Sequence, residues 1–142
     1  QHGIRDPLWS RGLGDVYKRQ ANHLPSGVMV ETDAPVDNQG KGESFSPTDL
    51  CASSLGVCML TILGIVAQNN GIDLAEAKGR VTKEMSEDLP RRISKISITI
   101  ELPLSSNHPK KEFIEEAMMN CPVHHSLNPE IEKNIIFVWQ EN

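Results

Sequence analysis

Two of the three cysteines are spaced so that a fold could set up thiol chemistry between them. Cys58 lies in the middle of an uncharged stretch, and Cys121 lies 63 residues later, directly before a proline. Two such residues form a reactive pair only if the fold brings their Cα atoms within about 7 Å, so that one thiol attacks and the other resolves. The competing interpretation is that Cys58 is a small core residue, as buried free cysteine often is.

Cys121 carries the stronger chemical signal of the two. Cys121-Pro122 is expected to open a short helix through about residue 127, and the unpaired N–H groups at a helix start favour a thiolate. Cys51 lies seven residues before Cys58 on the same predicted helix. It has no expected partner, and we interpret it as core packing.

A metal site is a further hypothesis for the same region. His124 and His125 follow Cys121 at a spacing that occurs in zinc sites, with Cys58 and His108 as remote candidate ligands. A zinc site usually needs two such pairs, and the sequence offers one. We therefore expect no metal and no organic cofactor.

A long helix is predicted to carry Cys58. Ser46 and Asp49 match a capping box, Pro47 suits the first helical position, and Gly71 suits a helix end. The helix is expected over residues 47–70. Residues 50–67 contain no charge, which is close to the lower limit for a membrane span, but the ends of this stretch lack basic flanks and aromatic belts. A buried central helix is therefore the preferred interpretation.

The central helix is also expected to meet a second chain. A helix that is apolar all round must be covered on every side, which one small domain can hardly do alone. Ala52, Gly56 and Gly64 are interpreted as one face of small residues that lets another helix approach closely.

The remaining pattern predicts an α+β fold. Strands are expected over 27–33, 80–86, 93–102 and 134–139, and the apolar alternation in 93–102 indicates a half-buried antiparallel strand. An amphipathic helix is expected over 110–119, with Phe113, Ile114, Ala117 and Met118 inward. Strands and helices in this order are typical of the α+β class.

Composition limits the class of partner and the compartment. The 142-residue chain has 14 basic and 19 acidic residues and a net charge of −5, which argues against nucleic-acid and anionic-membrane binding. Three cysteines are too few for a disulfide scaffold, and no signal-peptide pattern opens the chain, so we expect a cytoplasmic protein.

The first twenty residues differ from the rest of the chain. Residues 1–20 contain four basic and two acidic residues, three glycines and no sustained period. We interpret 1–20 as a non-native or chimeric leader and 21–142 as the domain proper, whose first strand is missing or replaced.

Three stretches resemble the OsmC/Ohr family. These are TDAPVDNQGKGESFSPTDLCASSLGVCMLTI, EMSEDLPRRISKI and NCPVHHSLNPEI, and the resemblance runs from about His23 to Trp139. It implies an OsmC-like fold in which a long central helix packs against an antiparallel sheet, in an intertwined homodimer. It also implies a peroxiredoxin-like peroxidase that defends against oxidative stress.

The resemblance implies a role for each thiol. Cys58 would be oxidised by an organic hydroperoxide to a sulfenic acid and would condense with Cys121, and a dithiol reductant, lipoyl-linked in some members, would restore both. The family also supplies an arginine and a glutamate that activate the first cysteine. Here the glutamate position falls on Thr48, with Asp49 beside it, and the arginine position falls on Lys18, with Arg19 beside it.

Two functions therefore follow from the sequence. The first is a thiol peroxidase that uses Cys58 and Cys121. The alternative is a non-catalytic dimer of the same fold that binds a small apolar ligand or senses oxidants, which the altered Thr48 favours.

Overall fold

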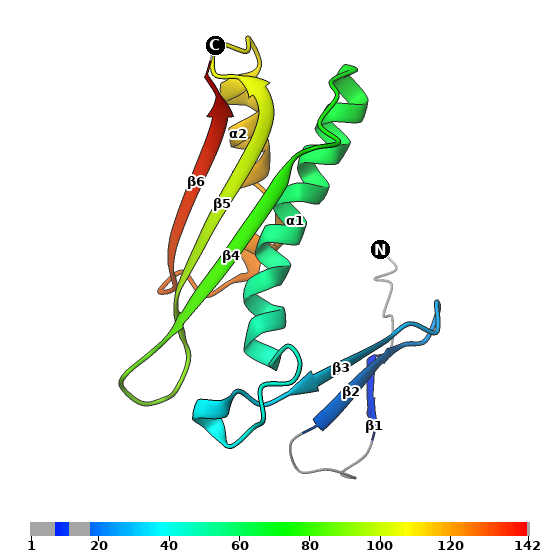
Figure 1. The fold of residues 1–142 in the computed structure, drawn as a ribbon, viewed down its shortest axis with the longest axis vertical. Coiled ribbons are helices and arrows are strands. Elements are labelled where there is room, and N and C mark those ends of the chain that lie inside the picture. The colour runs from blue at the N-terminus through cyan, green and yellow to red at the C-terminus, as the bar shows by residue number, and fades with distance from the viewer. Residues whose placement is uncertain (1–7, 12–17, 142) are drawn as a thin grey trace. The chain divides into compact units, whose positions relative to one another are not determined.

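The structure is a computed structural model that describes residues 8–11 and 18–141, with side chains from residue 20 onward. The chain divides into two compact units, residues 1–50 and 51–142. Figure 1 shows the elements of both units along the chain.

The first unit contains a three-stranded antiparallel sheet in the order β1-β2-β3. Its strands are β1 (Leu8–Arg11), β2 (Lys18–His23) and β3 (Met29–Asp33), and a 3-10 turn, η1 (Val36–Asn38), follows them. The sequence predicted no element in residues 1–20, so β1 and the start of β2 are a correction. Pairing with a neighbouring strand stabilises such segments without a clear apolar period. The origin of residues 1–20 stays a prediction.

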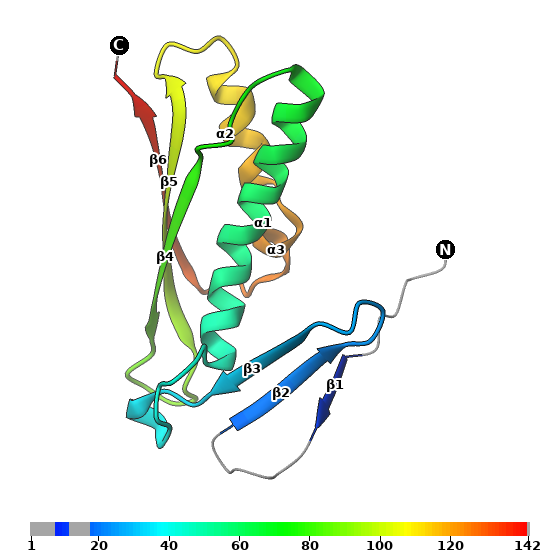
Figure 2. The same ribbon diagram turned by 45° about the vertical axis from the view of Figure 1, so that its right-hand side comes forward.

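The second unit is a two-layer α/β sandwich. The strands β4 (Lys78–Met85), β5 (Ile93–Ser105) and β6 (Glu132–Gln140) form one sheet in that order. The helices α1 (Pro47–Asn70), α2 (Lys111–Met119) and α3 (Pro122–Ser126) lie on one side of it (Figure 2). The α+β prediction is confirmed.

The central strand β5 fixes the core. Ile96, Ile98, Ile100 and Leu102 are each at most 2% exposed, as the alternation predicted. β5 pairs antiparallel with β4 but parallel with β6. The expected antiparallel pairing therefore holds for one neighbour only, because alternation reveals which face is buried and not the direction of the partner strand.

The helix α1 has the predicted bounds and the predicted cap. The Ser46 Oγ accepts a hydrogen bond from the Asp49 N–H at 3.1 Å, and an Asp49 carboxylate oxygen accepts one from the Ser46 N–H at 2.9 Å. By length and composition α1 is also long and apolar enough to cross a membrane. In the described residues, however, it packs against the sheet and buries Leu55, Met59 and Leu63.

The small residues of α1 do not form one face, which corrects the prediction. Gly56 is buried, and a Cβ added there would lie 2.5 Å from Val81 Cγ2 in β4. Gly64 is exposed and has nothing within 4 Å of such a Cβ. Eight residues rotate a helix by roughly 80° past whole turns, so the two glycines point in different directions. Gly56 admits the chain's own sheet rather than a second helix.

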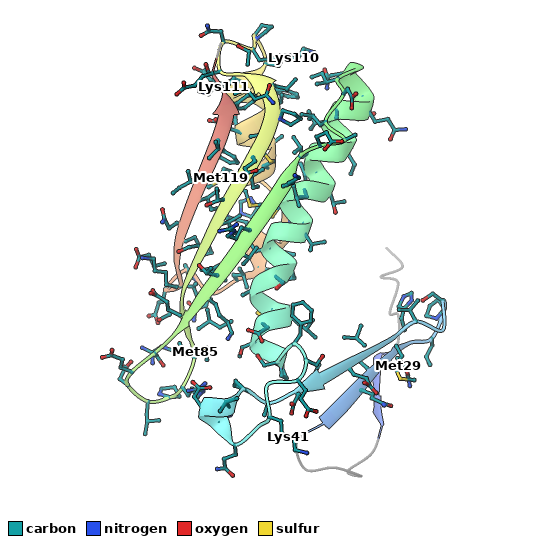
Figure 3. All side chains as sticks on the ribbon, in the orientation of Figure 1. Met29, Lys41, Met85, Lys110, Lys111 and Met119 are labelled. Carbon is teal, nitrogen blue, oxygen red and sulfur yellow. The ribbon has the colours of Figure 1, made fainter. Side chains whose placement is uncertain are left out.

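The helix α2 is fixed to the sheet and to α1 by polar contacts. The Trp139 Nε1–H donates to the Glu115 carboxylate at 2.7 Å, and the Lys111 ammonium lies 5.7 Å from the Trp139 ring centroid. Lys110, beside Lys111 at the start of α2 (Figure 3), donates to the Asn70 side chain at 2.5 Å. These contacts position α2, which ends two residues before Cys121.

The inward face of α2 is narrower than predicted. Ile114 and Met118 are fully buried, but Phe113 is 52% exposed. The prediction of Phe113 in the core is therefore wrong. A nine-residue helix buries a single stripe at a spacing of four, and Phe113 lies beside that stripe.

Candidate functional site: a pair of thiols between α1 and α3

The first thiol is carried by the middle of α1. Cys58 is half-buried and packs against the hydrophobic core of the second unit. Of its two neighbours in the sequence, Val57 is exposed and Met59 is fully buried. Cys58 therefore lies at the border between the buried and the exposed stripes of α1, where a sulfur can contact the core and still be reached from outside it.

The second thiol occupies the N-cap position of α3. Cys121 adopts an extended conformation, and its Sγ accepts a hydrogen bond from the His124 N–H at 3.3 Å. Pro122 follows at the first helical position, where no N–H donor is needed. The Cys121 side chain is 0% exposed. The short helix predicted from Cys121-Pro122 is thus present and directs a backbone donor at the sulfur.

The fold brings these two sulfurs together. Cys121 belongs to the buried core of the second unit, Cys58 packs against that same core, and the Cys58 thiol is near enough to raise the pKa of Cys121. Both cysteines are free thiols. Two side chains that lie 63 residues apart in the sequence therefore share one site within the second unit.

Burial dominates the electrostatics of the buried thiol. It raises the pKa of Cys121 above the ordinary value of 9.0, and the neighbouring Cys58 thiol raises it further. The N–H groups of His124 and Val123 act in the opposite direction because they stabilise the thiolate. Burial therefore keeps the Cys121 thiol protonated, while the backbone donors stabilise its thiolate when one forms.

The four supporting candidates precede residue 51, where the second unit begins: Thr48 and Asp49 lie in the first turn of α1, and Lys18 and Arg19 lie in β2. Thr48 Oγ1 hydrogen-bonds with Ser46 Oγ at 3.1 Å, and the Asp49 carboxylate serves the helix cap. The side chains of Lys18 and Arg19 lie outside the described residues. Any part that these four residues take in activating Cys58 stays a prediction.

The two histidines that follow Cys121 are not arranged as metal ligands. The His125 Nε2 contacts the Asn120 side-chain oxygen at 3.3 Å, and His124 meets the His125 ring edge to face at 5.7 Å. Within the described ranges, no group of three or more His, Cys, Asp or Glu side chains is placed to hold a metal ion. The geometry gives the zinc hypothesis no support.

The third cysteine is not a core residue. Cys51 is exposed, so its interpretation as core packing is wrong for this chain. Its carbonyl oxygen accepts a hydrogen bond from Ser54 Oγ at 2.6 Å. Seven residues rotate a helix by roughly 700°, about 20° short of two turns, so Cys51 and Cys58 share one side of α1, and the difference in their exposure comes from what packs against each turn of the helix.

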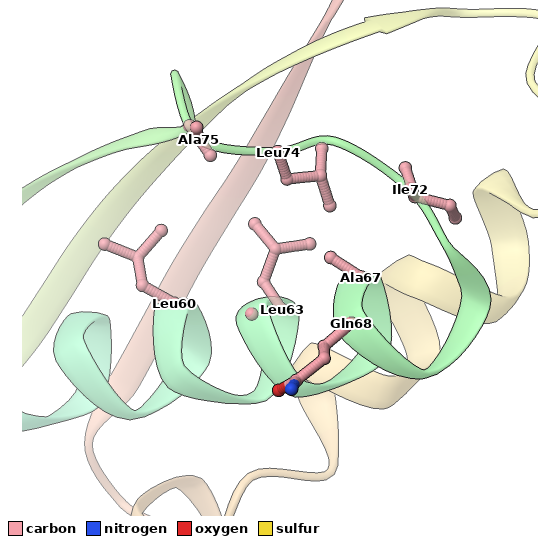
Figure 4. A pocket seen from close by; sticks show the side chains of 9 residues that line it. Leu60, Leu63, Ala67, Gln68, Ile72, Leu74 and Ala75 are labelled. Carbon is pink, nitrogen blue, oxygen red and sulfur yellow. The ribbon is translucent and has the colours of Figure 1, made fainter.

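Sequence reasoning missed a cavity at the C-terminal half of α1. It has a volume of about 380 Å³ and is lined by apolar side chains of α1 and of the segment that leads into β4. Figure 4 shows Leu63 and Ala67 pointing from the helix toward Leu74, with Gln68 as the polar group at its edge. The signal available in the sequence was Gly64, a lining residue that contributes no side chain.

Comparison with known proteins places this arrangement in a family. Residues 40–135 match the family model described as OsmC-like protein. The chain belongs to the OsmC-like protein family. The family resemblance found in the sequence is thereby confirmed, and the matched residues include both Cys58 and Cys121.

Two relatives show how far the OsmC-like match extends. A crystal structure from Psychrobacter arcticus, provisionally assigned to an osmotic stress induced and detoxification response, is 42% identical with a TM-score of 0.85, and the match covers 96% of this chain and 98% of that one. An uncharacterized protein of Methanocaldococcus jannaschii is 34% identical over 105 residues, or 68% of this chain. The chain spans about half, 53%, of that curated relative.

A more distant structure supports the OsmC-like fold. An organic hydroperoxide resistance protein from Legionella pneumophila superposes with a TM-score of 0.74 at 12% identity, and the match covers 97% of this chain and 99% of that one. At this identity the likeness concerns the fold alone.

Proposed function

We propose that this OsmC-like chain is a thiol-dependent peroxidase that reduces organic hydroperoxides and so protects the cell against oxidative stress. The observation that carries the proposal is the meeting of the Cys58 and Cys121 thiols at one site. The names of family relatives, which refer to detoxification and organic hydroperoxide resistance, support the same chemistry.

The proposed first step uses the more accessible thiol. The Cys58 thiolate attacks one oxygen of the hydroperoxide, the O–O bond breaks, and the alkoxide leaves and takes up a proton to become an alcohol. Cys58 is then a sulfenic acid. Its half-buried position against apolar side chains favours an organic substrate over a small polar one.

The second step joins the two sulfurs. The Cys121 sulfur attacks the Cys58 sulfur, an S–S bond forms, and the sulfenic oxygen leaves as water after it gains a proton. A second thiol within reach protects the sulfenic acid from further oxidation. A dithiol reductant then returns both cysteines to thiols and leaves as an intramolecular disulfide.

We further propose that the working form is a cytoplasmic homodimer. On α1, Val57 is 63% exposed and Ile65 is 49% exposed, and together with Thr61 they form an uncovered stripe of the helix. A second copy would cover this stripe. Sedimentation equilibrium tests the proposal, because a mass of one chain at micromolar concentration would contradict it.

Turnover is the direct test of the peroxidase. We expect dihydrolipoamide oxidation that depends on cumene hydroperoxide, and we expect Cys58→Ser and Cys121→Ser to abolish the catalytic cycle. Cys51→Ser is the matched control, since Cys51 lies on the same helix and is exposed. Equal loss of activity in all three variants, or full activity without Cys58, would contradict the proposal.

The cavity beside Leu63 favours a second candidate function. Its volume of about 380 Å³ falls within the roughly 300–1,000 Å³ typical of small-molecule sites, which suits a binding protein for a small apolar ligand. A fluorescent fatty acid tests this candidate. Gly64→Phe should fill the cavity and reduce binding, whereas Thr61→Phe, on the exposed side of α1, should not.

A further inference from the structure

The Cys58–Cys121 site is asymmetric with respect to solvent. Cys58 is half-buried, whereas Cys121 is 0% exposed. A thiol that reduces a disulfide must approach one sulfur from the side opposite the S–S bond, and access helps to decide which sulfur is attacked. Association with another chain can only remove exposed surface, so the burial of Cys121 holds in any assembly of this fold.

The buried sulfur of the pair, Cys121, is also the one whose negative charge a backbone N–H can stabilise. The Cys121 sulfur is the N-cap acceptor for the His124 N–H at 3.3 Å. A thiolate released there gains a charge-assisted hydrogen bond without any movement of the backbone. Burial works against this release because it disfavours the charged sulfur. Access therefore favours attack at the Cys58 sulfur, and the backbone donor lowers the free-energy cost of releasing Cys121 as a thiolate.

We propose that reduction of the disulfide is directional: the incoming thiolate attacks the Cys58 sulfur, forms a mixed disulfide with Cys58, and expels Cys121 as a thiolate that the His124 N–H receives. The electron pair of the broken S–S bond leaves with the Cys121 sulfur. The second thiolate of the dithiol then attacks its own sulfur in the mixed disulfide and releases Cys58. The inference rests on the disulfide of the proposed function.

The test traps the first intermediate with glutathione, which has a single thiol and cannot complete the second step. The Cys51→Ser protein is oxidised with diamide, mixed with glutathione, quenched in acid, alkylated with N-ethylmaleimide and mapped by mass spectrometry. We expect glutathione on the Cys58 peptide and the alkyl group on Cys121. Glutathione on Cys121 would overturn the inference.

A matched pair of variants tests the contribution of the His124 N–H donor. His124→Pro removes the N–H that bonds Cys121, whereas His124→Ala keeps it. We expect glutathione to attack the disulfide about tenfold more slowly in the Pro variant only, the change expected when one hydrogen bond to a charged group is lost. Equal rates would overturn the role of the donor. The mapping of the trapped intermediate does not depend on whether the Pro variant folds.

The same experiment separates this inference from the proposed function. A chain that forms no Cys58–Cys121 disulfide with diamide would overturn both. A chain that forms the disulfide and is attacked at Cys58, yet shows no turnover with hydroperoxides, would contradict the peroxidase and uphold the directional reduction.

Discussion

The close approach of α1 to β4 predicts that a substitution at Gly56 is destabilising in the native chain and stabilising once Val81 is made smaller. A Cβ on residue 56 would lie 2.5 Å from Val81 Cγ2, roughly 1 Å inside an ordinary carbon–carbon contact. Val81 is β-branched and its rotamer is stiff, so the strain falls on the packing of helix against strand. Gly56→Ala therefore combines a helix-propensity gain of about 1 kcal/mol with an overpacking cost of about 1–3 kcal/mol.

We expect Gly56→Ala to lower the free energy of unfolding by about 1 kcal/mol, the difference between those two effects. In a Val81→Ala background the obstructing methyl group is gone, and the same change should raise the free energy of unfolding by about 1 kcal/mol. The coupling of about 2 kcal/mol exceeds the usual scatter of additivity, about 0.5 kcal/mol.

Urea denaturation followed by circular dichroism measures all four proteins of this cycle. Protein concentration is held constant, because any self-association would add to the apparent stability. A Gly56→Ala change that is equally destabilising in both backgrounds would rule out contact with Val81 as the source of the cost.

Three further predictions concern titration and the contact between α2 and β6. Burial raises the pKa of Cys121, so the reduced protein should lose stability as the pH rises above about 9, where the unfolded thiol ionises; in urea titrations Cys121→Ala should lack this loss. Burial, and then the charge of Lys133, lower the pKa of His124; NMR titration should show Lys133→Met raising it while leaving it below 6.5. Glu115→Ala should cost about 1–3 kcal/mol in urea because it leaves the buried Trp139 N–H without its acceptor, and Glu115→Gln should cost less.

The elements could be predicted where the signal is local. The Ser46–Asp49 capping box and the apolar alternation of β5 depend on residues a few positions apart, and both predictions are confirmed. The parallel pairing of β6 with β5 depends on how the intervening α2 and α3 cross the sheet, which no local period records. The strands β1 and β2 were missed for a related reason, since their pairing compensates for an irregular pattern.

The sequence identified which residues form the site but not how exposed each one is. The family motifs identified Cys58 and Cys121, but the spacing alone left Cys58 equally explicable as core packing. The His124 N–H directed at Cys121 is a local cap of α3, but the difference in exposure between the two thiols depends on how distant elements pack around them. The exposure of Cys51 likewise depends on which side of α1 the sheet and α2 leave uncovered.

Mapping the thiols after one equivalent of cumene hydroperoxide tests whether Cys58 and Cys121 form a redox pair. We expect a loss of two hydrogens per chain, a Cys58–Cys121 link in the peptide map, no link in Cys58→Ser or Cys121→Ser, and an unchanged link in Cys51→Ser. Thiols that stay reduced, or a link that includes Cys51, would contradict this pairing.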